Sequence, residues 1–467
     1  ITQSSSEFTI SFCVRENENE TVRRILNEEF VHEMQDKLVN EVSVLSGMSI
    51  VSIVGDGMIS TKGIAGKFFS ALAFGGINIH AIAQGSSERS ISTVVAKDEG
   101  DKAVRIAHRF FFDTMQTIEL FLFGIGVVGG KLLEQVRLQQ KELEKSNIAL
   151  RVCGIANSRV MCLDRSSLDL SAWNDLLAAS DTPSSVDGML SFVRSEQPLN
   201  PVFVDCTATG DLPLRYADIL EAGIHVVTPN KRANSGDMDY YQSIRSAAAK
   251  NRKRFLYETN VGAGLPVIDT FRNMLKSGDR LLRFEGIMSG SLSYIFGRLD
   301  EGISFSQAVL EAREKGFTEP DPRDDLSGMD VARKALIIAR EAGMTLNLDD
   351  VICEGALPDS FDTSGTVEEF LARLPEIDEW YKKRITAVKA AGNVLRFVGT
   401  ITDGRAAAGP VEVPQDGPLA VITGGSNAFV FTTRYYSPIP LVIHGYGAGA
   451  DVTAAGVFAD ILRTATW

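Results

Sequence analysis

The stretch TIELFLFGIGVVG, residues 117–129, contains the strongest local signal in the sequence. Residues 117–123 are mostly apolar, as expected for a strand at the centre of a parallel sheet. The glycine pattern G-x-G-x-x-G begins directly after this strand, and a helical pattern follows at residues 131–145. A strand, a glycine-rich turn and a helix in this order predict the first unit of a doubly wound α/β domain that binds a dinucleotide.

The three glycines of this pattern have different expected roles. Gly124 permits the tight turn, and Gly126 lets the main chain approach a pyrophosphate at the positive end of the helix. Gly129 allows the helix to pack closely on the strand. An ordinary glycine turn is the alternative, but the flanking strand and helix favour a nucleotide site. The predicted cofactor contacts in this turn are Gly124, Ile125, Gly126, Val127, Val128 and Gly129.

Further elements continue the α/β pattern and then change it. Strands are predicted at residues 149–155, 202–206 and 224–228, with helix-like stretches between them. From about residue 261 helices mix with strands, which predicts a separate α+β domain. The expected helices there are residues 268–276, 294–301, 305–315 and 329–342, and the expected strands are residues 282–288 and 440–444, with a last helix at 452–462.

The end of the second strand indicates which dinucleotide is bound. NAD sites usually carry a carboxylate there for the ribose 2′-hydroxyl, but this strand ends in IANSR, residues 155–159. Asn157 and Arg159 offer donors and a cation, which favours the 2′-phosphate of NADP. A solvated loop arginine is the alternative, and NAD(H) remains a possible cofactor.

Two other strand ends carry polar residues. Ligands bind at the carboxyl ends of the strands in such sheets. Thr207 follows one of these strands and is a predicted cofactor contact. Lys231 follows another and is expected near the nicotinamide, with a plain surface lysine as the alternative.

The richest polar stretch is EPDPRDDLSGMDVARK, residues 319–334. Ser327 and Asp330 form a Ser-x-x-Asp helix-start signal, and Asp330 and Lys334 then lie four apart on one helical face. A cap and a solvated salt bridge are the ordinary interpretation. The helix is apolar nearly all round, however, which predicts burial, with Arg333 and Arg340 as the wet side. A lysine held by an aspartate can supply the proton that hydride transfer to an aldehyde requires.

The first 115 residues contain an internal repeat. QSSSEFTIS at residues 3–11 returns as QGSSERSIS at residues 84–92. Strands at 49–54 and 77–82 and a helix at 63–74 lie between the copies, which predicts two small α/β modules. The chain begins ITQ, with neither an initiator methionine nor a signal peptide, so we expect a piece of a longer polypeptide.

Composition excludes several classes of function. The chain has 467 residues, 44% hydrophobic and 23% charged, which fits about three globular domains. A net charge of −13 argues against nucleic acid or an anionic membrane as the main partner. Five scattered cysteines predict reduced thiols in a cytoplasmic protein, and no apolar run is long enough for a transmembrane helix.

Several motifs together resemble homoserine dehydrogenase. They are the glycine fingerprint, residues 228–231, ETNVGAGLP at 258–266, SGSLSY at 289–294 and the acidic stretch at 319–334, in the family's order. The first 115 residues resemble the ACT regulatory region of aspartokinase. The whole chain therefore resembles a threonine-sensitive bifunctional aspartokinase/homoserine dehydrogenase that lacks its kinase domain. The resemblance implies four parts: residues 1–115, ACT-like and regulatory; 116–260, a Rossmann-type NAD(P)-binding domain; 261–438, an α+β catalytic and dimerisation domain; and 439–467, a segment returning to the nucleotide domain.

The resemblance also implies roles for individual residues. Lys334 would be the proton donor, and Lys231 would lie close to the reacting carbon. Glu319, Asp325, Asp330 and Ser291 would hold the substrate or its ordered water. Phe317 stands where the family often has a tyrosine, so a hydroxyl contact to substrate is expected to be missing.

Further implied sites bind a cation, the cofactor and an effector. Glu258 and the carbonyls of Val261, Ala263 and Leu265 would hold a monovalent cation, sodium, with an ion-free glycine-rich turn as the alternative. Gly447 would touch the cofactor. Gln3 and Gln84 would belong to two threonine sites. Dimers would form through the catalytic domain, and the full bifunctional chain would form tetramers.

The expected reaction is reversible reduction of L-aspartate 4-semialdehyde to L-homoserine with NADPH, in threonine and methionine biosynthesis. A phosphorylating semialdehyde dehydrogenase is an alternative enzyme, and it would need the thiolate of Cys206. An amino-acid sensor with an inactive nucleotide domain is an alternative of a different class.

Overall fold

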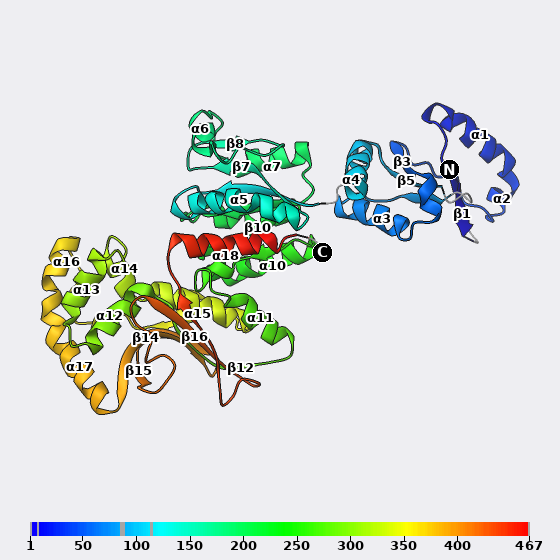
Figure 1. Ribbon diagram of the computed structural model, residues 1–467. Helices are drawn as coiled ribbons and strands as arrows, with labels where there is room; N and C mark the ends of the chain where they lie inside the picture. The colour runs from blue at the N-terminus through cyan, green and yellow to red at the C-terminus, as the bar shows by residue number, and fades with distance from the viewer. Residues whose placement is uncertain (1, 7–8, 85–88, 113–114, 466–467) are drawn as a thin grey trace. The chain divides into compact units, whose positions relative to one another are not determined.

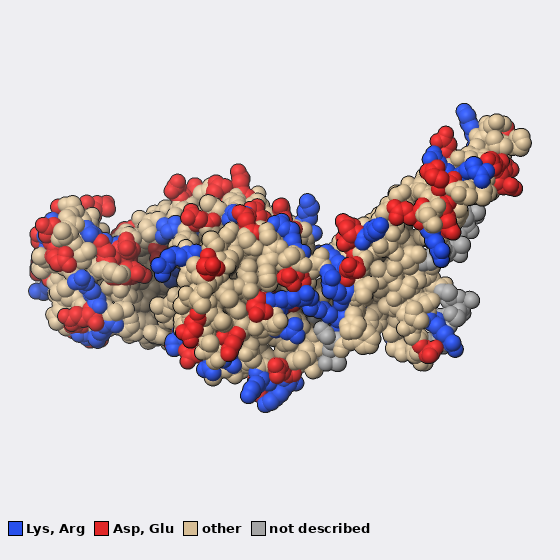
Figure 2. All heavy atoms as spheres, turned by 90° about the horizontal axis from the view of Figure 1, so that it is seen from above, with Lys and Arg blue, Asp and Glu red and all other residues tan. Residues whose placement is uncertain are grey.

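The computed structural model describes residues 2–6, 9–84, 89–112 and 115–465. The chain divides into two compact units, residues 1–116 and 117–467 (Figure 1). Within the described residues, no helix is both long and apolar enough to cross a membrane. Acidic and basic side chains are interspersed on the face that Figure 2 shows, as the mixed composition predicts.

The first unit is a small α/β structure. Its described strands form the antiparallel pair β1 (Thr2–Ser6) and β2 (Thr9–Phe12) and a sheet of order β3-β5-β4. The sheet strands and the helices packed with them are β3 (Met48–Val54), β4 (Ala81–Gln84), β5 (Ser90–Ala96), α3 (Ile64–Phe74) and α4 (Gly100–Phe112). Helices α1 (Asn19–Glu29) and α2 (Val31–Gln35) bury no residue. The strand expected at 77–82 begins at Ala81 instead, because the helix ends in a turn at Gly75 and Gly76 and residues 77–80 are irregular.

The nucleotide half of the second unit is a six-stranded sheet of order β11-β10-β9-β6-β7-β8. Its strands are β6 (Gln116–Phe123), β7 (Ile148–Ala156), β8 (Met161–Leu163), β9 (Pro201–Asp205), β10 (His225–Val227) and β11 (Phe255–Leu256). The chain passes from β6 to β7 on one side and later returns to β9 on the other. The order therefore reverses at β6, and crevices for ligands form at the carboxyl end of such a strand. The glycine turn begins at this end of β6, with Gly124.

Both faces of β6 are covered, which explains its nearly continuous apolar sequence. Ile118, Leu120 and Leu122 face α5 (Val127–Lys145) and α18 (Ala450–Leu462) in one buried cluster. Phe121 and Phe123 lie in a second cluster with α7 (Val186–Glu196), α8 (Tyr216–Glu221) and α10 (Met238–Lys250). Burial on both faces removes the polar alternation of a half-exposed strand. The doubly wound fold that the sequence predicts is confirmed.

The second half of this unit is built on a mostly antiparallel sheet of order β13-β15-β14-β12-β16-β17. Its strands are β12 (Leu281–Ile287), β13 (Ile352–Cys353), β14 (Asn393–Thr402), β15 (Arg405–Pro414), β16 (Ser426–Thr433) and β17 (Leu441–Tyr446). Its longer helices are α11 (Ile268–Lys276), α12 (Gly290–Asp300), α13 (Phe305–Glu314), α15 (Met329–Glu341) and α17 (Asp378–Ala390).

The last thirty residues are divided between the two halves. Strand β17 pairs with β16 in the antiparallel sheet, and the chain then turns at Gly449 into α18. Helix α18 packs beside α5 on the nucleotide sheet (Figure 1). The segment therefore ties the two sheets together.

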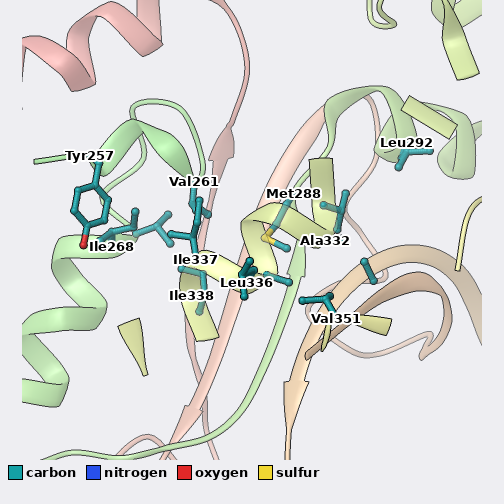
Figure 3. Close-up of a cluster of buried hydrophobic side chains, with 14 of the residues drawn as sticks. Tyr257, Val261, Ile268, Met288, Leu292, Ala332, Leu336, Ile337, Ile338 and Val351 are labelled. Carbon is teal, nitrogen blue, oxygen red and sulfur yellow. The ribbon is translucent and has the colours of Figure 1, made fainter. Parts of the chain in front are cut away.

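Helix α15 lies inside the second half and supplies much of its core. Val331, Leu336 and Ile338 are buried, and Figure 3 shows Leu336 and Ile338 with Met288 and Val261 in this cluster. The predicted burial of this helix is confirmed. The prediction that Arg340 lies on its wet side is wrong, because Arg340 is only 4% exposed.

The cap at the start of α15 also differs from the prediction. Gly328, in the left-handed region with φ 74°, is the N-cap, and the Ser327 hydroxyl oxygen beside it accepts a bond from the Met329 N–H at 3.3 Å. The same hydroxyl donates to the carbonyl of Asp324 in the preceding short helix α14 (Pro322–Leu326). The Ser-x-x-Asp pattern thus marks the start of α15 correctly, but the Asp330 carboxylate binds two lysines instead of closing a capping box.

The turn after β6 is sterically restricted at two glycines. Gly124 has φ +88°, and a Cβ there would lie 2.7 Å from the backbone nitrogen of Thr207. A Cβ at Gly129 would lie 2.0 Å from the carbonyl oxygen of Gly124. Only glycine at position 129 therefore lets helix α5 pack against the carbonyl of Gly124 without a steric clash.

Replacement of Gly129 by alanine should destabilise the protein, because the methyl group must push helix α5 from the turn. We expect a loss of about 1–3 kcal/mol in the free energy of unfolding, measured by urea denaturation. The matched control is Gly130→Ala, where a Cβ meets no atom within 4 Å. This control should gain about 0.5–1 kcal/mol from helix propensity. Equal stability of the two variants would contradict the steric argument.

Candidate active site

The glycine turn lies against the ends of two neighbouring strands. The backbone N–H of Gly124 donates to the carbonyl of Ala156 at the end of β7 at 2.9 Å. On the other side, the turn touches Thr207, which follows β9. A Cβ built at Gly126 meets nothing within 4 Å, so the main chain is open at the N-terminus of α5. These features fit the pyrophosphate of a dinucleotide.

The turn after β7 carries the two residues expected to select the nucleotide. The side-chain oxygen of Asn157 accepts bonds from the N–H groups of Arg159 and Val160 at 2.7 and 2.9 Å. This oxygen is therefore used to shape the turn between β7 and β8. Arg159 is exposed at the same turn, where its cation can meet a phosphate.

A buried polar network holds the loops that follow β9 and β10. The Asp205 carboxylate accepts bonds from the Tyr216 hydroxyl at 2.5 Å and from the Thr207 N–H at 2.7 Å. Burial raises the pKa of Asp205, although these bonds oppose the rise. The Asn230 side-chain amide donates to the carbonyls of Thr207 and Thr209 at 3.1 and 2.9 Å. The network ties the residue before Lys231 to the loop that touches Gly124.

Two lysines share one carboxylate across the two halves of the unit. Lys231 Nζ lies 3.2 Å from Asp330 Oδ1, and Lys334 Nζ lies 2.7 Å from Asp330 Oδ2. Lys334 also donates to the carbonyl of Met288 at 2.6 Å. Lys231 comes from the end of β10, whereas Asp330 and Lys334 come from α15, so only the tertiary structure unites the three.

The electrostatics of this group favour proton donation. Burial lowers the pKa of Lys334, and Lys231 lowers it further, while Asp330 opposes both effects. Desolvation would raise the pKa of Asp330, but the two ammonium groups overcome it and hold this pKa well below its usual range. Asp330 therefore stays ionised beside a lysine whose proton is easier to release than that of a solvated lysine.

The remaining expected substrate residues form a second cluster beside the lysines. Asp325 accepts a bond from the Ser291 hydroxyl at 2.6 Å and another from the Glu319 N–H at 2.8 Å. Burial raises the pKa of Asp325, and the bonds from Ser291 and Glu319 lower it. Ser291 lies in the first turn of α12, and Glu319 is exposed. The structure thus brings the Ser291 hydroxyl and the Glu319 main chain to the Asp325 carboxylate, which can bind an ammonium group.

Phe317 lies next to this cluster and is held by packing. Its ring stacks on Tyr294 with centroids 4.9 Å apart, and a Cβ at Gly425 would lie 3.1 Å from it. The Tyr294 hydroxyl accepts a bond from Lys315 at 2.8 Å. The same hydroxyl donates to the Glu311 carboxylate at 3.1 Å, so its bonds are used between α12 and the end of α13.

The expected cation site is a tight buried turn. Both oxygens of Glu258 accept backbone N–H bonds, from Ile268 at 2.7 Å and Asp269 at 2.8 Å, and so they cap α11. Burial raises the pKa of Glu258 to about 7. Within the described chain, no group of three or more His, Cys, Asp or Glu side chains could hold a metal ion.

The backbone part of this turn is compatible with a hard cation. The expected ligands Val261, Ala263 and Leu265 follow one another closely, and Ala263 has a positive φ of 51°. The Leu265 carbonyl accepts a bond from the Val267 N–H at 2.9 Å. Gly264 packs against α18, where a Cβ would lie 2.4 Å from the Val452 carbonyl. Carbonyl oxygens are the donor type that hard cations prefer.

The other expected contacts lie in different surroundings. Gly447 lies just after β17 against the side chain of Asn427, which a Cβ would overlap at 2.2 Å. Gln84 ends β4 in the first unit and is exposed. Gln3 lies in β1. Residues 85–88, the rest of the repeated loop, are outside the described part of the chain.

Cys206 lies beneath the glycine turn. Its Cβ is 3.6 Å from a Cβ built at Gly129, and its side chain packs against the core of the nucleotide sheet. Burial raises the pKa of its thiol, and the charge of Asp205 raises it further. A thiolate nucleophile needs the opposite environment.

Three family models match the chain. One described as "Homoserine dehydrogenase" matches residues 266–462, and one described as "Homoserine dehydrogenase, NAD binding domain" matches residues 124–258. A third, described as "ACT domain", matches residues 51–111. These matches confirm the resemblance found in the sequence.

The chain is also similar to curated proteins. The bifunctional aspartokinase/homoserine dehydrogenase of Haemophilus influenzae is 52% identical over 99% of this chain and 57% of its own length. The chloroplastic bifunctional aspartokinase/homoserine dehydrogenase 1 of Arabidopsis thaliana is 43% identical over 100% of this chain and 52% of its own length. The chain therefore spans about half the length of the curated relatives it matches.

Solved structures share the fold of the second unit. A Candida auris protein of unknown function has a TM-score of 0.70 and 34% identity, covering 75% of this chain and 98% of its own. A hyperthermophilic archaeal homoserine dehydrogenase in complex with NADPH has a TM-score of 0.58 and 24% identity, covering 74% and 97%. The similarity to the archaeal enzyme, at 24% identity, shows only that the two chains share a fold.

Proposed function

Because this chain belongs to the homoserine dehydrogenase family, we propose that it interconverts L-aspartate 4-semialdehyde and L-homoserine with a nicotinamide cofactor, NADP(H) in preference to NAD(H). The observation that carries the proposal is the Lys231–Asp330–Lys334 group. It offers an ammonium proton on helix α15 beside the ends of β9 and β10, where the cofactor's reacting ring would lie. A nicotinamide supplies the hydride when it is bound.

The residues of this group would divide the work of proton transfer. Lys334 donates its proton to the carbonyl oxygen during reduction and takes it back during oxidation. Asp330 holds both ammonium groups in place and keeps its own charge. Lys231 places a second positive charge where negative charge develops on the oxygen.

The second cluster would bind the amino-acid part of the substrate. Asp325 and Glu319 provide acidic groups for the substrate ammonium, and Ser291 fixes the orientation of Asp325. Burial of Asp325 excludes water from one side of this contact. The aldehyde would then point towards Lys334.

The cofactor would lie along the glycine turn, from Gly124 to Gly129. Arg159 would meet the 2′-phosphate of NADP, with Asn157 shaping its turn. Thr207 would lie beside the nicotinamide end, and Gly447 would contact the cofactor from the loop before α18. The absence of a carboxylate at residues 155–159 supports NADP over NAD.

The proposal has three further parts. Glu258 and the carbonyls of Val261, Ala263 and Leu265 would hold sodium as a structural cation. The first unit would bind threonine near Gln3 and Gln84 and lower the activity, as a feedback control of threonine synthesis. The chain would work in the cytoplasm as a dimer, or as a tetramer when joined to a kinase domain.

Substitution Lys334→Ala should abolish turnover while cofactor binding persists, because the lysine touches the reacting oxygen and not the pyrophosphate. We expect a fall in kcat of roughly 10²–10⁴-fold, measured with homoserine and NADP. The Kd for NADPH, measured by fluorescence, should change less than twofold. The control Arg333→Ala removes the neighbouring exposed arginine and should leave both quantities unchanged. Equal losses of turnover and cofactor affinity in Lys334→Ala would make the lysine structural.

Substitution Cys206→Ala separates the proposal from a thiol-dependent dehydrogenase. The buried, protonated thiol has no place in the proposed reaction, so the folded variant should keep its homoserine oxidation within about threefold of the parent. Thermal unfolding of the same sample establishes that it is folded. Complete loss of activity in folded protein would favour the phosphorylating enzyme.

A steady-state assay with homoserine and each cofactor, with and without threonine, tests specificity and control together. We expect kcat/KM to be higher with NADP than with NAD, because Arg159 meets the extra phosphate, and threonine to reduce the rate. Arg159→Ala should reduce the difference in kcat/KM between NADP and NAD. A folded chain that oxidises no homoserine would instead be an amino-acid sensor with an inactive nucleotide domain.

A further inference from the structure

Arg340 is a buried arginine that bonds to the segment after Lys231 and to the loop after its own helix, where Asn347 Oδ1 also accepts from it at 3.3 Å. Its guanidinium donates to the carbonyls of Asn234 and Gly236 at 2.9 and 2.8 Å, and to the carbonyl of Leu346 at 2.9 Å. The guanidinium also lies over the ring of Tyr241, 4.8 Å from its centroid. Within the described residues, no carboxylate lies within salt-bridge distance of it.

The segment whose carbonyls accept the Arg340 bonds begins at Lys231. Short helix α9 (Arg232–Ser235) has Lys231 as its N-cap, and the N–H groups of Asn234 and Ser235 donate to the Lys231 carbonyl at 3.0 and 2.9 Å. The Asn234 carbonyl at the far end of this turn accepts from Arg340. The main chain between the lysine and the arginine's acceptors is thus a single hydrogen-bonded turn.

The other end of the connection is helix α15. Arg340 lies six residues after Lys334, about 9 Å along the helix axis, so it does not reach the reacting atoms. It joins the helix that carries Asp330 and Lys334 to the turn that carries Lys231. The 3.2 Å contact between Lys231 and Asp330 spans the same two segments.

We propose that Arg340 is a positioning residue that sets the distance between Lys231 and the Asp330–Lys334 pair by binding the carbonyls at the end of α9. The inference rests on the proposed function and deepens it by adding a residue that acts on the reaction through Lys231. Three directed donors of a planar guanidinium reach three separate carbonyls, which a lysine ammonium or an apolar side chain cannot do.

The proposal has a consequence that a structural role lacks. The charged groups that face Lys334 are Asp330 on its own helix, Lys231 after β10 and Asp325 on α14. If Lys231 moves away, Lys334 loses the repulsion of the Lys231 ammonium and no longer shares the Asp330 carboxylate with it. Both changes raise the pKa of Lys334. Reduction needs protonated Lys334, so the alkaline limb of its pH profile should move to higher pH.

The test compares Arg340→Lys and Arg340→Met with the parent protein and with Arg333→Met, which alters an exposed arginine on the same helix. Four quantities are measured: kcat/KM for aldehyde reduction across pH, the Kd for NADPH, the unfolding temperature, and the pH dependence of acetylation of Lys231 and Lys334 read by mass spectrometry. The last readout needs no enzyme activity.

We expect both Arg340 variants to lose at least about tenfold in kcat/KM, since small misplacements of reacting groups cost this much. Their alkaline limb and the acetylation midpoint of Lys334 should move to higher pH, and the Kd for NADPH should stay within twofold. Arg333→Met should match the parent in all four measurements.

Several results would overturn the inference. Activity lost without a change in the pH profile or in lysine acetylation would make Arg340 structural, and so would failure of both variants to fold. An undiminished kcat/KM would show that Lys231 is positioned without it. If the parent protein itself reduces no aldehyde, the proposed function fails, and the acetylation midpoints alone decide whether Arg340 positions the lysines.

Discussion

The site depends on the two ion pairs that the Asp330 carboxylate forms, one with Lys231 and one with Lys334. Two ammonium groups held this close repel each other, and a single carboxylate between them makes the arrangement stable. The same carboxylate joins a loop of the parallel sheet to a helix of the antiparallel half. The contact therefore serves the chemistry and is also one of the links between the two halves, beside the shared core and the Arg340 bonds.

The surrounding fold supports this contact from both sides. Behind Lys231, the Asp205–Tyr216 pair and Asn230 hold the loops after β9 and β10, and Arg340 binds the end of α9. Behind Lys334, helix α15 is buried among apolar side chains and cannot rotate freely. Helix α18 then covers the nucleotide sheet beside α5, so the end of the chain completes a domain that begins more than three hundred residues earlier.

The sequence was most informative where the chemistry is local. The strand predicted at 117–123 is observed as β6, because its apolar run and the glycine turn are local signals, while α5 begins at Val127, four residues before the predicted start. Helix α15 was also predicted to within a residue, at 329–342, from a start signal followed by a nearly continuous apolar run. The antiparallel strands β14, β15 and β16 were not predicted, since their pairing partners are distant and their own sequences are mixed.

By itself, the sequence determined the doubly wound half, the family to which the chain belongs and the residue types of the site, because short motifs encode backbone turns and reactive groups. Tertiary structure decided what each group touches. It turned Asp330 from a helix cap into the link between two lysines, and it buried Arg340, which the helical pattern placed in water. It also set Cys206 beneath the glycine turn. The physical reason is the same in each case: burial and charge pairing depend on residues that are far away along the chain, and only folding brings them together.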